Sequence, residues 1–325
     1  MQQILMFFRK ITAVLLGSVF FLSTLTAAPE KIQPRDRDNL KLDLAILADV
    51  HMEGNNFGRF AMLSKAFKNL NAVKNDADAL ILLGDNTMNG QTGEFLLFYG
   101  MLETVNPIKP YYTIVGNHDV GNSESADFAA YQKRNLEFMQ TFVDQDLKTL
   151  YYAKVINGYH LIFLAPDAGE SAQRTFSDAQ MDFLETELNK AKESGLPAFV
   201  FNHYPGSRAS NSRFTDILES YEKTFLIVGH MHSYTRFTSV SGTNIPEIWV
   251  PCFGRMDDKN EKASGRSGWG YQMEVYDDKV SFRGVNYYAG TLLENVTQEY
   301  TLTDDGVKAI DPMITPPIFP PVIWA

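Results

Sequence analysis

Five short apolar segments of this chain each end in a group of Asp, Asn or His residues. The apolar segments span residues 44–48, 80–83, 112–115, 199–201 and 226–228. The polar groups that follow them are Asp49-Val50-His51, Gly84-Asp85-Asn86, Gly116-Asn117-His118-Asp119, Asn202-His203 and Gly229-His230-Met231-His232. Segments of this length and composition are typical of buried β-strands. Because open α/β sheets place ligand sites at the carboxyl ends of their strands, the pattern predicts one shared site that contains five of the six histidines.

The segments between these strands have helical periodicity. Phe60, Leu63, Phe67 and Leu70 share one helical face, and residues 124–148 form a further helical pattern. Ser177 and Gln180 have the spacing of a capping box at the start of another helix. After about residue 243 the chain reads as consecutive strands. We therefore expect an α/β fold, layered as in α+β proteins, with more than one sheet in one domain.

Composition limits the classes of partner. The chain has 325 residues, of which 45% are hydrophobic, and a formal net charge of −10. An acidic surface repels a long polyanion, so we expect no long nucleic acid as a partner, whereas a small phosphorylated substrate is compatible with bound cations. Cys252 is the only cysteine, so an intramolecular disulfide is impossible.

The N-terminus has the features of a secretory signal. Arg9 and Lys10 precede the apolar residues 11–25, and small residues near Ala27 offer a cleavage site. An uncleaved membrane anchor is the alternative. We predict a secreted or periplasmic protein without a stable membrane span after cleavage. The predicted division is a signal at 1–27, a charged linker at 28–39, the main domain at 40–303 and a Pro-rich tail at 304–325, which either packs on the domain as an extended strap or binds a partner.

The two histidines of the last group, His230 and His232, raise a question of geometry. In a strand, residues i and i+2 point to the same face, so both side chains can bind one metal ion. Taken alone, such a short motif favours a chance pair on a solvated face, and the other histidines decide between the two.

The ordered set DxH, GD, GNHD, H and GHxH resembles the calcineurin-like metallophosphoesterase superfamily, over roughly residues 40–287. Within it the pattern looks closest to the cyclic-nucleotide-phosphodiesterase-like branch. The resemblance implies a four-layer αββα sandwich with two packed mixed β-sheets and a two-metal site at the strand ends. The implied ligands are Asp49, His51 and His232 for the first ion and Asn117, His203 and His230 for the second, with Asp85 bridging both. In this reading His230 and His232 bind different ions.

The residue types suit this chemistry on their own terms. Imidazole and carboxylate ligands suit Mn, Zn and Fe, and the lack of thiolates argues against a structural zinc site. Two divalent ions outweigh the charge of Asp49 and Asp85, and the neutral Asn117 preserves the positive charge that attracts a phosphate. Such a pair generates hydroxide near neutral pH, and in the family this hydroxide bridges the ions and attacks phosphorus in line.

The GNHD group also contains the family's usual general acid, His118. We expect it to protonate the leaving alkoxide, with Asp119 holding it in the protonated form. A His118 that only braces the loop is the alternative.

Two subfamilies fit less well. The segment after Asp85 lacks the arginine of protein Ser/Thr phosphatases, and Met88 and Asp119 stand where purple acid phosphatases have Tyr and Glu. The sequence predicts a dinuclear hydrolase of phosphodiesters or phosphomonoesters. A catalytically silent metal-binding scaffold and a metallohydrolase of a non-phosphate bond are the alternatives. The residues near enough to the motifs to reach a substrate are Asn55, Asn56, Asn86, Tyr204, Arg208 and Arg255.

Overall fold

The computed structural model describes residues 31–74, 76–106, 108–121, 127–167, 175–208, 211–232, 235–254 and 268–310. The signal predicted at 1–27 and residues 311–325 of the predicted tail lie outside them. No helix within these ranges is long and apolar enough to cross a membrane.

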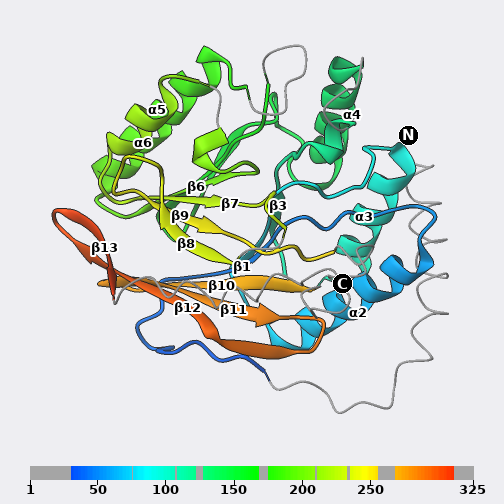
Figure 1. The fold of residues 1–325 in the computed structure, drawn as a ribbon, viewed down its shortest axis with the longest axis horizontal. Coiled ribbons are helices and arrows are strands. Elements are labelled where there is room, and N and C mark those ends of the chain that lie inside the picture. The colour runs from blue at the N-terminus through cyan, green and yellow to red at the C-terminus, as the bar shows by residue number, and fades with distance from the viewer. Residues whose placement is uncertain are drawn as a thin grey trace, which may run out of the picture.

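Two β-sheets form the centre of the molecule (Figure 1). The first sheet contains β1 (Leu42–Leu47), β2 (Ala79–Leu82), β3 (Tyr111–Thr113), β10 (Trp269–Val275), β11 (Lys279–Asn286), β12 (Thr291–Thr303) and β13 (Gly306–Ile310). Its strand order is β13-β12-β11-β10-β1-β2-β3. The second contains β4 (Tyr152–Ile156), β5 (Tyr159–Phe163), β6 (Ala198–Asn202), β7 (Thr224–Val228), β8 (Arg236–Ser239) and β9 (Pro246–Trp249). Its order is β4-β5-β6-β7-β9-β8, and both sheets mix parallel with antiparallel pairs.

Helices α2 (Phe57–Val73) and α3 (Thr92–Thr104) cover the outer face of the first sheet, and α5 (Asp178–Ser194) and α6 (Phe214–Glu219) cover that of the second. Helix α4 (Phe128–Phe142) places Met139 in the cluster between the sheets. Two 3₁₀ turns, η1 (His118–Val120) and η2 (Gly206–Arg208), lie in the loops after β3 and β6. The helix predicted at Ser177 begins there, and the Ser177 side chain accepts a hydrogen bond from the backbone of Gln180. The other half of the predicted capping box is wrong, because the Gln180 side chain bonds both backbone groups of Ala165.

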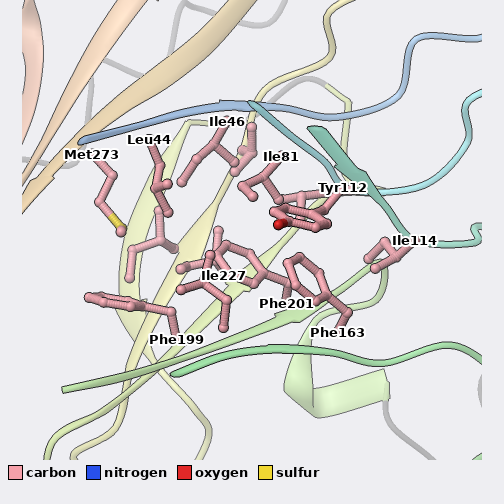
Figure 2. Close-up of a cluster of buried hydrophobic side chains, with 14 of the residues drawn as sticks. Leu44, Ile46, Ile81, Tyr112, Ile114, Phe163, Phe199, Phe201, Ile227 and Met273 are labelled. Atoms are coloured by element: carbon pink, nitrogen blue, oxygen red, sulfur yellow. The ribbon is translucent and has the colours of Figure 1, made fainter. Parts of the chain in front are cut away.

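The alternation of side chains along β1 explains the layers. Leu44 and Ile46 face the second sheet and pack in the cluster between the sheets, where they meet Phe199 and Ile227 (Figure 2). Residues 45 and 47 belong instead to the cluster that packs under α2 and α3. A third cluster joins the outer face of β6 to α5 and α6. Helix, sheet, sheet and helix therefore form four layers, which confirms the predicted αββα sandwich.

Two described segments extend past the predicted domain boundaries. Within the predicted linker, Ile32 is buried and donates a backbone hydrogen bond to Val73 at 2.8 Å, and Arg35 forms an ion pair with Glu299. Within the predicted tail, β13 pairs with β12. These two pieces therefore pack as parts of the sandwich.

Candidate metal centre

The predicted site residues meet because the strands that carry them end at one edge of the two sheets. In the first sheet β1, β2 and β3 are parallel neighbours, and in the second β6 and β7 are parallel neighbours. Their carboxyl ends lead into five loops, which carry the predicted ligands Asp49, His51, Asp85, Asn117, His203, His230 and His232.

The first group of possible ligands contains Asp49, His51, Asp85 and His232. One ligand atom from each lies within 4.8 Å of all the others. The Nε2 atoms of His51 and His232 are 3.0 Å apart, and His232 Nε2 lies 3.0 Å from Oδ1 of Asp49. Such close imidazole nitrogens and carboxylate oxygens form a cage that suits one small cation.

The second group contains Asp85, His203 and His230, together with the amide of Asn117. Oδ2 of Asp85 lies 3.3 Å from Nε2 of His203. Oδ1 of Asn117 lies 3.2 Å from that nitrogen and 3.1 Å from Nδ1 of His230. The other ring nitrogen of His203 lies 2.7 Å from the Leu83 carbonyl, which favours a proton there and leaves Nε2 to face the group. Asp85 is thus shared by both groups.

Each of the two carboxylates has one oxygen fixed by the backbone and one aimed at the site. The backbone N–H of His230 donates to Oδ2 of Asp49 at 3.0 Å, and that of His118 donates to Oδ1 of Asp85 at 2.8 Å. Oδ1 of Asp49 and Oδ2 of Asp85 are buried and accept no well-directed hydrogen bond from the described residues. Buried carboxylate oxygens without such partners are costly, so their convergence fits a bound cation.

The backbone at the ligands is unusual. In the described part of the chain six non-glycine residues have positive φ, and five of them are Asp49, His51, Asp85, His230 and His232, with φ between 45° and 70°. The left-handed region costs energy for residues with a β-carbon and is concentrated at functional sites.

The backbone at His230 and His232 differs from the extended strand that periodicity predicts. β7 ends at Val228, so His230 and His232 do not alternate as strand residues. Their left-handed conformations send His232 to the first group and His230 to the second. The expectation of one ion gripped by both side chains is therefore wrong, because it assumed extended backbone past Gly229.

Burial and contact set the charges of these groups. Burial opposes ionisation of both Asp85 and His203, but their mutual contact outweighs it, lowering the pKa of Asp85 and raising the pKa of His203 to about 9. Burial, with the charge of His203 added, lowers the pKa of His230 to about 3, and burial also lowers the pKa of His51. His51 and His230 are therefore neutral near pH 7, the form in which imidazole binds metals.

His118 lies beside the first group, but its orienting contact differs from the prediction. Its ring packs edge-on against His51, and its Nδ1 lies 2.7 Å from the carbonyl oxygen of Met88. The Asp119 carboxylate accepts hydrogen bonds from the backbone of Gly116, Asn86 and Thr87 and from the side chains of the latter two. Asp119 thus joins the GNHD loop to the GDN loop. The Met88 carbonyl, and not Asp119, contacts the ring nitrogen of His118.

The residues predicted to reach a substrate differ in exposure and in contacts, and Asn55 among them is exposed. Asn86 and Tyr204 are buried, and the Asn86 amide donates to the Ile114 carbonyl. Asn56 caps α2 through its contact with the Arg59 backbone. Arg208 is half-buried and contacts His230. Arg255 lies outside the described residues.

Two further residues, Arg59 and Cys252, lie near the site, and no sequence motif predicts their position there. Arg59 is buried in α2 and donates to the main-chain oxygen of His51 at 3.0 Å. The buried thiol of Cys252 donates to the main-chain oxygen of Asp49 and lies near His51 and His232. The contact of Cys252 joins segments far apart in the sequence, and that of Arg59 depends on where α2 begins, so only the fold reveals them.

Comparison with known proteins agrees with this geometry. The sequence profile of the calcineurin-like phosphoesterase family matches residues 42–234. The chain is 28% identical over 179 residues to a probable glycerophosphodiester phosphodiesterase GpdQ of Arcobacter nitrofigilis, covering 50% of this chain and 59% of that one. It is 22% identical to purple acid phosphatase 21 of Arabidopsis thaliana, covering 51% and 40%. The chain thus spans less than two thirds of each relative.

A solved structure, vacuolar protein sorting 29 from Cryptosporidium parvum, matches 84% of this chain and 98% of its own at 10% identity. Its TM-score of 0.34 is too low to support a fold assignment.

Proposed function

Because the chain belongs to the calcineurin-like phosphoesterase family, we propose that it is a dinuclear metal-dependent phosphoester hydrolase. One observation carries the dinuclear part: two groups of ligand atoms share Asp85, whose Oδ2 is buried without a well-directed hydrogen bond. A carboxylate common to both groups is the arrangement that holds two ions close together.

In this proposal Asp49, His51 and His232 hold the first ion, and Asn117, His203 and His230 hold the second, with Asp85 bridging. The donor set of imidazole, carboxylate and amide fits Mn, Zn or Fe. When bound, the two ions would supply hydroxide near neutral pH and offset the charge of the phosphoryl group. The left-handed backbone at five ligands fixes the donor atoms before any ion binds, which lowers the cost of ordering them.

His118 is the proposed general acid. Its Nδ1–H donating to the Met88 carbonyl would leave Nε2 as the atom that gives its proton to the leaving oxygen. The Met88 carbonyl would thus orient the ring, the task that the sequence assigned to Asp119. Asp119 supports the reaction indirectly, by fixing the loop that carries Asn117 and His118.

The proposed substrate is a small phosphodiester or phosphomonoester. The relative from Arcobacter is named as a phosphodiesterase and the Arabidopsis relative as a phosphatase, so the comparisons support both classes. Together with the signal predicted at 1–27, this proposal assigns the reaction to the periplasm or the medium.

The test is metal-dependent hydrolysis. The full chain is stripped with a chelator, reconstituted with Mn, Zn or Fe, and assayed with aryl phosphate mono- and diesters and a cyclic phosphate. We expect stripping to abolish turnover and at least one metal to restore it. A protein that holds two ions but hydrolyses none of these esters would contradict the proposal and favour the silent scaffold.

A further inference from the structure

We propose that Arg208 binds a non-bridging oxygen of the substrate phosphoryl group and thereby positions it over the two ligand groups. This inference rests on the proposed function and adds a residue that the metal-binding motifs do not contain. It also identifies the part of the substrate that Arg208 binds, which is the anionic phosphoryl group.

The position of Arg208 follows from the loop after β6. This loop starts at His203, a predicted ligand, and turns through η2, which ends at Arg208. Nη1 of Arg208 lies 2.8 Å from Nε2 of His230. The guanidinium therefore reaches the ring whose other nitrogen faces Asn117 in the second ligand group.

Backbone hydrogen bonds hold the loop that carries Arg208. The backbone N–H of Gly206 donates to Oε1 of Glu247 at 2.6 Å, and Glu247 on β9 is buried. The Arg208 backbone N–H donates to the Pro205 carbonyl at 2.9 Å. These contacts hold the main chain while the long side chain remains half-buried, so the guanidinium can move over a short range without loss of the turn.

The chemistry of His230 makes the guanidinium available to an anion. Nε2 accepts from Arg208 only while the ring proton is on Nδ1. If His230 held an ion through Nδ1, that proton would lie on Nε2, and two donors would then face each other. The guanidinium would then need another acceptor, and a phosphoryl oxygen at the adjoining ligand groups would match its planar pair of N–H donors.

A second arginine near the site is placed for a different task. Arg59 is 1% exposed and donates to the main-chain oxygen of His51, which ties α2 to the first ligand loop. Arg208 contacts a predicted ligand through its ring and is partly accessible. The comparison assigns Arg59 to support of the loop and Arg208 to the substrate.

The experiment compares Arg208→Ala and Arg208→Lys with a control on the same segment, Arg213→Ala. Arg213 lies five positions further on and pairs with Asp182 and Glu185 of α5, so its loss tests the general effect of removing a cation. For each metal-loaded protein we would measure bound metal, the Kd of inorganic phosphate by calorimetry, and kcat and KM with an aryl phosphate.

We expect Arg208→Ala to keep the wild-type metal content and to weaken phosphate binding and raise KM by about 10- to 100-fold, the loss of a charge-assisted hydrogen bond. Arg208→Lys should lie between, because it keeps the charge but not the planar pair of donors. Arg213→Ala should match the wild type.

Three outcomes would overturn the inference: unchanged phosphate affinity in Arg208→Ala, an equal loss in Arg213→Ala, or loss of metal, which would make Arg208 a support of His230. Failure of the proposed function gives a different result, because the wild-type protein itself would then show no turnover. Phosphate binding to the metal-loaded protein still tests Arg208 in that case.

Discussion

Both ends of strand β1 carry a buried carboxylate, but the side chains that surround the two carboxylates differ. At the amino end, Asp43 forms an ion pair with the buried Lys74, which also lies 3.1 Å from Asp76. Next to this pair, the buried Glu274 contacts Arg283 at 2.9 Å. At the carboxyl end, the free oxygen of Asp49 faces imidazole rings.

The difference separates a structural cluster from a candidate site. At the amino end the chain supplies its own cations, and Asp43 stands on regular strand backbone. At the carboxyl end the backbone is left-handed at Asp49 and His51, and no Lys or Arg among the described residues pairs with Asp49. A buried acid alone is therefore a weak sign of function. A buried acid that has no paired cation and stands on left-handed backbone is the stronger sign.

The largest effect should come from the carboxylate shared by both ligand groups. Replacing Asp85→Asn removes the bridging charge, so we expect loss of at least one bound ion and a fall in kcat of more than about 100-fold. Metal analysis and initial rates measure it. The matched control is Asp43→Asn at the other end of the same sheet, which should keep its metal. Equal metal loss in both variants would mean that the two ends of β1 are not distinct.

The next effect should come from His118→Ala. This change leaves the proposed ligands intact, so metal content should stay at the wild-type value while kcat falls by about 10²–10⁴-fold for esters with poor leaving groups. Esters of acidic phenols, whose leaving oxygen needs no proton, should be affected much less. A uniform loss over all leaving groups would refute the role of general acid.

The structural end of β1 should respond in stability and not in chemistry. Lys74→Met leaves Asp43 buried without its cation, and we expect the free energy of unfolding to fall by about 3–5 kcal/mol. Chemical denaturation measures the change. Metal content and KM should remain as in the wild type, and a shift in either would show that this cluster influences the site.

The smallest effect is the pH dependence of the same cluster. Burial, only partly offset by Lys74, raises the pKa of Asp43 to about 6 from its ordinary value of 3.8. The folded state therefore binds more protons than the unfolded state between pH 4 and 6, so this group's contribution to stability falls as pH rises through that window and is constant above it. The total is on the order of 3 kcal/mol.

The comparison of wild type with Asp43→Asn isolates this contribution. The difference between their free energies of unfolding should decline from about pH 4 to pH 7. A difference that is flat with pH would contradict the raised pKa.

The four layers could be predicted because the ordered strand-end motifs resemble a known family, and the structure confirms them. The meeting of the polar groups at one edge could be predicted for a local reason, because residues directly after parallel strands lie at the same end of a sheet. Their role as metal ligands stays a prediction. The conformation of His230 and His232 was not predictable from periodicity, because the strand ends before them.

Contacts between loops were also beyond the sequence. Asp119 stands next to His118 in the chain, so a pairing between them was the natural expectation. Its carboxylate instead reaches the loop after β2, where it accepts from the backbone N–H groups of Asn86 and Thr87, and it also accepts from Gly116 in its own loop. Such a choice depends on how β2 and β3 lie side by side, as does the contact of Arg208 with His230 through β6 and β7.

The most direct test of the central claim is the number of metal ions bound per chain. The chelated full-length protein is reconstituted with excess Mn or Zn, freed of unbound metal, and analysed for metal and protein together with His232→Ala and His203→Ala. The account predicts two ions in the wild type and about one in each variant, because each histidine belongs to a different ligand group that shares Asp85. A wild-type protein that binds a single ion, or none, would contradict it.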